Sequence, residues 1–193
     1  LGETIGKEVR VHCLSILDQK FQTDSQLLAQ SKDALSKVLA RRDLGFHQVP
    51  MRDELWQEIS RVAGQIADDV VDMVVVGIGG SSLGPKALYE VFESPTQKRK
   101  IYFCDNVDRV EFDRTLARLR DLEKTIWVFT SKSGSTIETL VAADFAHQVY
   151  LENKKTLKAI VVTEKRKNPL FDWAQEKSFS ILEVPQELIA EFL

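Results

Sequence analysis

The sequence predicts an α/β fold, a doubly wound parallel sheet of about five strands with a helical N-terminal lead-in. The first observation is a set of short, almost wholly apolar runs in the last two thirds of the chain. The second is that amphipathic segments separate these runs. Parallel strands need a crossover between them, usually a helix, and helices then cover both faces of the sheet. The alternation therefore indicates a parallel sheet.

Five runs are expected to form the strands, because they combine β-branched or aromatic residues with few charges. They are MVVVG (73–77), IYFCD (101–105), TIWVF (125–129), KAIVV (158–162) and the weaker FSILEV (179–184). Helices are expected between them at 85–92, 109–120, 136–152 and 169–177. Ligands of such sheets bind at the carboxyl ends of the strands. The loops after 73–77 and 125–129 are therefore the places where a site is expected.

The first third of the chain lacks this alternation of apolar runs and amphipathic segments. Residues 25–42 and 53–67 carry apolar residues at helical spacing, joined by a loop with Gly45 and Pro50. We therefore expect a helical N-terminal extension at 1–72, a sheet domain at 73–185 and a tail of unclear origin at 186–193. Because the chain begins at Leu1 without a methionine, a fragment of a longer protein is expected.

Composition excludes several classes of partner. The formal net charge of -3 has no block of one sign, so neither a nucleic-acid surface nor a membrane patch is indicated. No apolar run is long enough to span a bilayer, and the first residues lack a signal-peptide pattern. Two cysteines, Cys13 and Cys104, are too few for a disulfide framework or a zinc site. A cytoplasmic protein without a metal is the expectation.

The first candidate loop is GIGGSSLGP, residues 77–85. Its glycines permit close approach of a ligand, and Ser81 and Ser82 add hydroxyl donors, so the loop could hold phosphate. It is not a Walker A loop, and as a dinucleotide fingerprint it has Ser82 at the third glycine position. Asp105 could then bind a ribose, which leaves a nicotinamide-dependent oxidoreductase open. A tight turn without a ligand is the plain alternative.

The second candidate loop is TSKSGSTIET, residues 130–139. Its hydroxyls crowd around Gly134 and Lys132 immediately before a helix that is expected to start near Thr136. Hydroxyls, free N–H groups and a positive helix end together suit a dianionic phosphate, although serines also serve as plain helix caps. Two such loops at one edge of a sheet favour a shared anion site. Without a Walker lysine or a carboxylate pair for Mg²⁺, a small phosphorylated metabolite fits better than a nucleotide.

At these residues the sequence resembles the phosphoglucose isomerase family. VVVGIGGSSLGP and FTSKSGSTIETL are similar to the two sugar-phosphate-binding segments of its first sugar isomerase (SIS) domain, and the resemblance covers roughly residues 73–185. It implies a flavodoxin-like SIS fold and a cofactor-free cytoplasmic enzyme of glycolysis and gluconeogenesis. That enzyme interconverts glucose 6-phosphate and fructose 6-phosphate, and its shared active sites imply a homodimer.

The resemblance also implies roles for individual residues. The residues matching the family's sugar-phosphate contacts are Gly79, Gly80, Ser81, Ser131, Lys132, Ser133 and Thr136. Glu138 matches a glutamate that supports a histidine from the neighbouring subunit, although on sequence alone it reads as surface charge. His12, His47 and His147 do not adjoin the two loops in sequence, so none of them is expected to catalyse the reaction.

Catalysis in the family moves a proton between C1 and C2 through an enediol, so it needs a base near the carbon. In the family this base is a glutamate. The resemblance places it, together with an arginine, a histidine and a lysine that also act in catalysis, later in the family's chain. Here QELIAEFL follows ILEVP in place of a GGRFS-type motif. We therefore expect the phosphate-binding part without the catalytic base, inactive alone. A non-catalytic SIS sensor of sugar phosphates is the main alternative.

Overall fold

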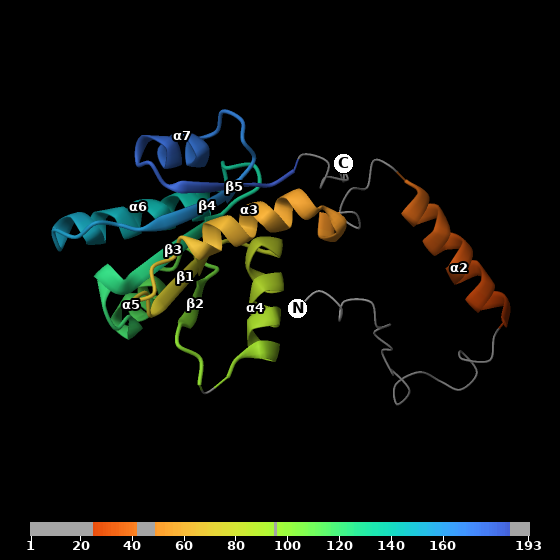
Figure 1. Cartoon of the computed structure of the whole chain (residues 1–193), viewed down its shortest axis with the longest axis horizontal. Helices are drawn as coiled ribbons and strands as arrows, with labels where there is room; N and C mark the ends of the chain where they lie inside the picture. The colour runs from red at the N-terminus through yellow and green to blue at the C-terminus, as the bar shows by residue number, and fades with distance from the viewer. Residues whose placement is uncertain (1–24, 42–48, 95, 186–193) are drawn as a thin grey trace.

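A single parallel sheet organises the chain. The computed structural model describes residues 25–41, 49–94 and 96–185 (Figure 1). Five parallel strands hydrogen-bond in the order β2-β1-β3-β4-β5. They are β1 (Asp72–Val76), β2 (Lys100–Cys104), β3 (Thr125–Thr130), β4 (Ala159–Thr163) and β5 (Ser180–Glu183). The predicted fold class is confirmed.

Helices separate the strands as the sequence predicts. They are α4 (Gly80–Phe92), α5 (Arg109–Arg118), α6 (Ile137–Glu152) and α7 (Pro169–Glu176), with a short 3₁₀ turn η3 (Leu122–Lys124) before β3. Helices α2 (Ser25–Ala40) and α3 (Asp53–Gly64) and the 3₁₀ turn η2 (Val49–Met51) precede β1. None of the helices within the described ranges has the length and apolar character needed to cross a membrane. The expected domain division at residue 72 stays a prediction, and the tail at 186–193 lies outside the described residues.

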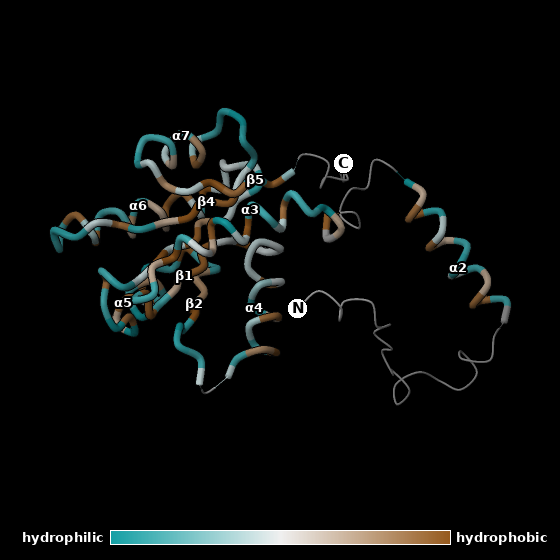
Figure 2. The backbone as a smooth tube through the Cα atoms, viewed as in Figure 1, coloured by the Kyte–Doolittle hydropathy of each residue, from teal (hydrophilic) through white to brown (hydrophobic). Residues whose placement is uncertain are grey.

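One face of the sheet carries the larger core. Val74, Trp127 and Val161 point to this face and are fully buried against α5, α6 and α7. Trp127 donates its indole N–H to the Tyr150 hydroxyl of α6 at 3.1 Å, and Tyr150 donates in turn to the Leu122 carbonyl at 2.8 Å. The apolar strand residues stand out in Figure 2. Helices on this side therefore fix β3 at the centre of the sheet.

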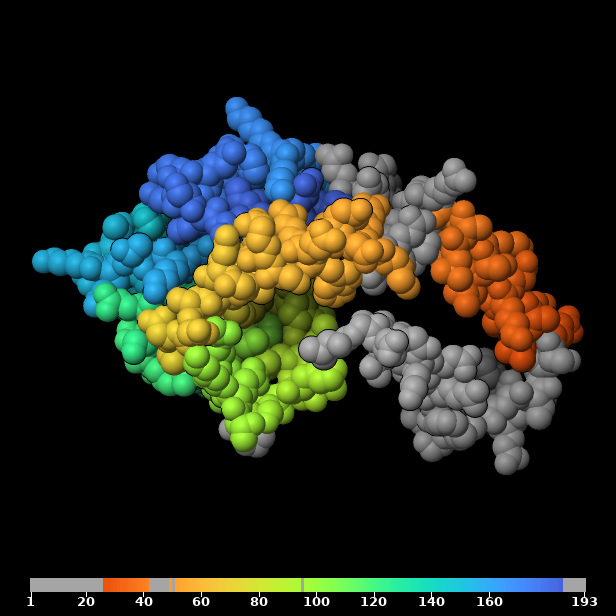
Figure 3. Space-filling model, viewed as in Figure 1, coloured from red at the N-terminus to blue at the C-terminus, as the bar shows by residue number. Residues whose placement is uncertain are grey.

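The opposite face is covered by α3 and α4. Val62 of α3 packs with Val70, Ile126 and Ile160 in a second core cluster. Helix α4 runs beside β1 and β2 on the same side, where the Tyr89 ring contacts the Phe103 ring. Helices on both faces make the sheet doubly wound, and Figure 3 shows α3 and α4 exposed on the viewed side.

Helix α4 begins earlier than the sequence predicts. We expected it from Pro85, but it starts at Gly80 and includes Pro85. Gly79 precedes it with φ 58° and ψ -122°, a conformation that a glycine adopts without a steric penalty. The early start puts Ser81 and Ser82 in the first helical turn.

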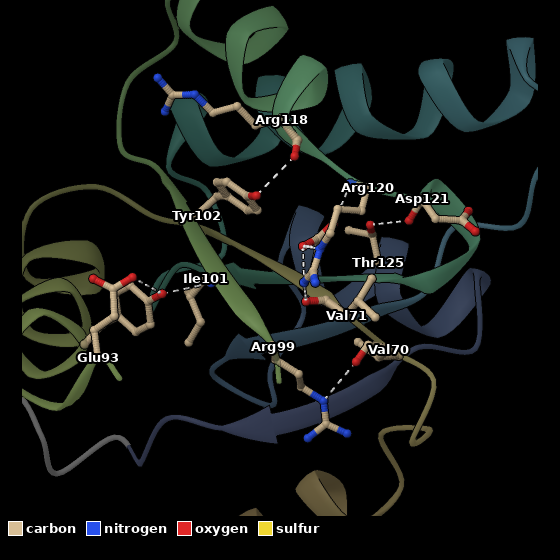
Figure 4. Close-up of polar contacts among 12 residues, drawn as sticks. Val70, Val71, Glu93, Arg99, Ile101, Tyr102, Arg118, Arg120, Asp121 and Thr125 are labelled. Carbon is tan, nitrogen blue, oxygen red and sulfur yellow. Dashed lines mark hydrogen bonds and ion pairs between the residues drawn. The ribbon is translucent and has the colours of Figure 1, made fainter. Parts of the chain in front are cut away.

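Polar contacts tie together the amino-terminal edge of the sheet (Figure 4). The carboxylate of Asp72 is wholly buried and accepts hydrogen bonds from Arg120, from its main-chain N at 2.6 Å, from Nε at 2.9 Å and from Nη2 at 2.8 Å. Arg99 donates through Nε to the Val70 carbonyl at 3.3 Å. The polar side chains at this edge therefore serve to stabilise the sheet, whereas the two loops singled out from the sequence lie at the opposite, carboxyl edge.

Candidate functional site

The candidate site lies where the strand order reverses. Loop 1 (residues 77–79) follows β1 and loop 2 (residues 131–136) follows β3, and Val76 pairs with Phe129. A Cβ added to Gly77 would lie 3.2 Å from the Thr130 carbonyl oxygen and 2.8 Å from the Ser81 Cβ. The two loops therefore lie side by side, and only glycine fits between them. In an open parallel sheet, the carboxyl end of the strands at this switch point is the usual place for a ligand.

Loop 1 leads directly into the first turn of α4. The main-chain N–H groups of Gly79 and Gly80 have no hydrogen-bond partner among the described residues. Ser82 is buried and donates its hydroxyl to the Gly79 carbonyl at 3.2 Å, so it stabilises the turn. Ser81 is half-buried, and its hydroxyl has no partner in the described part of the chain. Of the two serines, Ser81 is thus available to a ligand.

The hydroxyl groups of loop 2 form hydrogen bonds within the loop. The Ser131 Oγ lies 2.8 Å from the Thr136 Oγ1 and accepts a hydrogen bond from the Gly134 N–H at 3.1 Å. Ser133 accepts from the Ser135 hydroxyl at 3.0 Å and from its N–H at 3.3 Å. Ser131 is buried, whereas Ser133 and Ser135 are exposed. The loop therefore holds its shape and presents hydroxyls on its outer side.

Helix α6 begins at loop 2 without a side-chain cap. Thr136 is the N-cap residue, yet its hydroxyl turns to Ser131 instead. By contrast, Asp108 caps α5 and Asn168 caps α7, each accepting an N–H at 2.8 Å. The first-turn N–H groups of α6 lack partners within the described ranges; these are Ile137, Glu138 and Thr139. A helix N-terminus carries roughly half a positive charge, so this end suits an anion.

The remaining candidate residues differ in how close they lie to the two loops. Lys132 and Glu138 are half-buried in loop 2 and in the first turn of α6, and neither forms an ion pair with a described residue. Asp105, the candidate ribose ligand, follows β2 and pairs with Lys86 at 3.6 Å. His147 lies on α6, roughly 15 Å from its start at 1.5 Å per residue, and contacts Trp173. His12 and His47 lie outside the described residues.

Another concavity on the described surface has no comparable chemistry. A pocket of about 600 Å³ lies between α4 and the outer edge of β2. Both tyrosine hydroxyls that line it are already engaged, since the Tyr89 hydroxyl donates to Glu93 at 2.9 Å and the Tyr102 hydroxyl donates to the Arg118 carbonyl at 3.1 Å (Figure 4). No cluster of metal-ligating side chains occurs among the residues that the structure describes. Loops 1 and 2 therefore remain the candidate site.

Comparison with known proteins agrees with this geometry. The family model for phosphoglucose isomerase matches residues 22–166, three quarters of the chain. The chain belongs to the phosphoglucose isomerase family. This membership favours the isomerase reading over the sensor, and it leaves the nicotinamide reading of Asp105 without support.

Individual similar proteins are much longer than this chain. A glucose-6-phosphate isomerase of Thermus thermophilus is 33% identical over 171 residues, which are 83% of this chain and 40% of that protein. The solved structure of a hypothetical protein from Thermus thermophilus superposes with a TM-score of 0.70 at 31% identity, over 85% of this chain and 40% of that one. A Chlamydia trachomatis glucose-6-phosphate isomerase gives a TM-score of 0.60 at 27% identity, over 68% and 26%.

The chain spans only 14% to 40% of the length of the curated relatives that it matches. The match includes both candidate loops, since they fall inside residues 22–166.

Proposed function

We propose that this chain is the sugar-phosphate-binding part of a glucose-6-phosphate isomerase. The whole enzyme would interconvert glucose 6-phosphate and fructose 6-phosphate in the cytoplasm, in glycolysis and gluconeogenesis, without a cofactor. The observation that carries the proposal is the meeting of two helix N-termini, α4 and α6, neither with a side-chain cap, at the switch point of the sheet. Family membership supports a sugar phosphate as the anion.

Loop 2 and the start of α6 would bind the phosphate group, and loop 1 would lie along the sugar. The phosphate contacts are assigned to Ser131, Lys132, Ser133 and Thr136, and the sugar-phosphate lining to Gly79, Gly80 and Ser81. Each hydrogen bond to a charged group contributes about 1.5–3 kcal/mol, so a few such bonds account for selective binding of a phosphorylated sugar. The hydroxyls of loop 2 and the α6 amides are donors of this kind.

Proton transfer between C1 and C2 needs groups beyond these loops. A base must reach the substrate carbon, and the family resemblance assigns that role to a glutamate without a matching position in this sequence. Glu138 would support a histidine brought in by a second subunit, which requires a homodimer of the full enzyme. Its carboxylate suits that role because it is half-buried and has no ion-pair partner in the described part of the chain.

Calorimetric titration of the 193-residue chain tests the proposal. Glucose 6-phosphate and fructose 6-phosphate are expected to bind, inorganic phosphate more weakly, and glucose and NAD not measurably. Negligible isomerisation is expected, because the base is missing. Equal binding of glucose and glucose 6-phosphate would refute the phosphate assignment, and rapid isomerisation by this chain would refute the assignment of roles. Tight binding of NAD would revive the oxidoreductase reading.

A further inference from the structure

Residues 163–170, which run from the end of β4 into the first turn of α7, hydrogen-bond to loop 2. The Glu164 N–H donates to the Lys132 carbonyl at 3.1 Å, and the Thr163 hydroxyl donates to the same oxygen at 3.3 Å. The Leu170 N–H donates to the Gly134 carbonyl at 3.1 Å. Carbonyl oxygens repel an anion, so a loop that binds phosphate must point them away. The segment 163–170 holds two loop 2 carbonyls in that orientation.

Asn168 stabilises this segment with its whole side chain. It is 7% exposed, and its Nδ2 donates to the Glu164 carbonyl at 3.1 Å and to the Arg166 carbonyl at 3.0 Å. Its Oδ1 accepts the Phe171 N–H at 2.8 Å, which caps α7. Both amide protons and the amide oxygen are therefore in use. One side chain fixes the turn at 164–168 and the start of the helix that follows.

The same side chain fits against loop 2 at Gly134. A Cβ at residue 134 would lie 1.7 Å from the Asn168 Oδ1 and 2.1 Å from its Cγ, far inside van der Waals contact. Gly134 also has a φ of +65°, which disfavours other residues. The amide of Asn168 therefore occupies the space that a side chain at 134 would need, and the two residues set the spacing between loop 2 and the 163–170 segment.

We propose that Asn168 is a positioning residue for anion binding, which shapes loop 2 through the 163–170 segment without touching the ligand. The inference rests on the proposed role of loop 2 in phosphate binding. The sequence alone would assign Asn168 to capping, because asparagine before proline is a common helix start. The contact with Gly134 and the three side-chain hydrogen bonds add a second role.

The test compares Asn168→Ser with a matched cap variant, Asp108→Ala. Serine can still cap α7 but cannot donate to both carbonyls or fill the space beside Gly134. Asp108→Ala removes the cap of α5, a helix that forms no hydrogen bond with loop 2 among the described residues. We expect Asn168→Ser to raise the Kd for inorganic phosphate and for glucose 6-phosphate on the order of tenfold, and Asp108→Ala to leave both unchanged. Unchanged binding by Asn168→Ser would overturn the proposal.

A second readout needs no ligand. Hydrogen exchange at the amides of Gly134 and Ser135 is expected to quicken about tenfold in Asn168→Ser and to stay unchanged in Asp108→Ala, at temperatures where both remain folded. Faster exchange in both variants, or in neither, would overturn the positioning role. If the parent chain bound no phosphate while Asn168→Ser still loosened loop 2, the proposed function and the role in anion binding would both fail, and Asn168 would retain only its effect on the shape of loop 2.

Discussion

Ser131 and Thr136 face each other across loop 2, with their hydroxyl oxygens 2.8 Å apart. Because the Thr136 hydroxyl forms this contact, it does not cap the N-terminus of α6. The pair thus sets the hydroxyl geometry of the loop and keeps the helix end free for an anion.

The first prediction concerns this pair. Thr136→Val keeps the side-chain volume but removes the hydroxyl, so it should weaken glucose 6-phosphate binding by about 1.5–3 kcal/mol, roughly tenfold or more in Kd. Thr136→Ser should bind nearly as well as the parent chain. Thr156→Val, at an exposed threonine before β4, is the matched control for calorimetry. Equal affinities for Thr136→Val and Thr156→Val would contradict the assignment.

The second prediction concerns backbone strain at Gly79 in loop 1, with an unstrained glycine of α4 for comparison. A Cβ would meet nothing within 4 Å at Gly79 or at Gly84, but Gly79 has a φ of +58°. Gly79→Ala should therefore cost about 1–3 kcal/mol through strain alone. Gly84→Ala, inside α4, should instead stabilise the chain by roughly 0.5–1 kcal/mol. Urea unfolding measures both, and a neutral Gly79→Ala would show that residue 79 adopts another conformation.

The third prediction concerns the amino-terminal edge of the sheet. Arg120→Met removes the guanidinium that donates to the buried carboxylate of Asp72, and we expect a loss of about 3 kcal/mol in the free energy of unfolding. Arg114→Met breaks an exposed pair with Glu111 on α5, and should cost less than about 0.5 kcal/mol. Chemical unfolding of both variants checks the contrast. Similar small losses would mean that Asp72 is stabilised by the Arg120 main chain alone.

The fourth prediction is a pH dependence. Burial raises the pKa of the Cys104 thiol from 9.0 to about 11. The folded state then holds the proton more tightly than the unfolded state, so this stability is fully present below about pH 9 and is lost as the pH rises toward 11. The free energy of unfolding should fall by roughly 1–2 kcal/mol between about pH 9 and 10.5.

The matched variant for that measurement is Cys104→Ala, which lacks the thiol and should show a shallower decline over the same range. Burial also raises the pKa of Tyr150, from 10.0 to about 12, but its contribution is lost only above about pH 10 and is common to both proteins. Parallel slopes for the parent and Cys104→Ala below about pH 10 would show that Cys104 does not control this dependence.

Most of the fold is predictable because its strands are short apolar runs between amphipathic helices. The predicted run at 125–129 became Thr125–Thr130, and the run at 158–162 became Ala159–Thr163, shifts of one residue. The start of α4 was not predicted, because glycines and a proline normally mark turns. Here Gly79 supplies the unusual dihedral angles before the helix, and Pro85 is accepted within it.

The position of the candidate site in the fold could also be predicted in part, while the roles of its residues stay predictions. The loops that follow β1 and β3 carry their signals in the sequence, as glycines and clustered hydroxyls. The contribution of Asn168 is invisible there, because it depends on a contact between β4–α7 and loop 2 that only the folded sheet creates. Its one local signal, an asparagine before a proline, describes only the start of α7.

The strand order has a consequence for how the protein folds. β1 pairs with β3 although α4, β2 and α5 lie between them in the chain. Loops 1 and 2 therefore come together only after this long intervening segment has looped out. Loop closures of this length slow folding, and a ribosome releases β1 well before β3 and β4. The ability to bind an anion is therefore expected to arise late in folding, once β1 has paired with β3, and to be lost first when this pairing breaks.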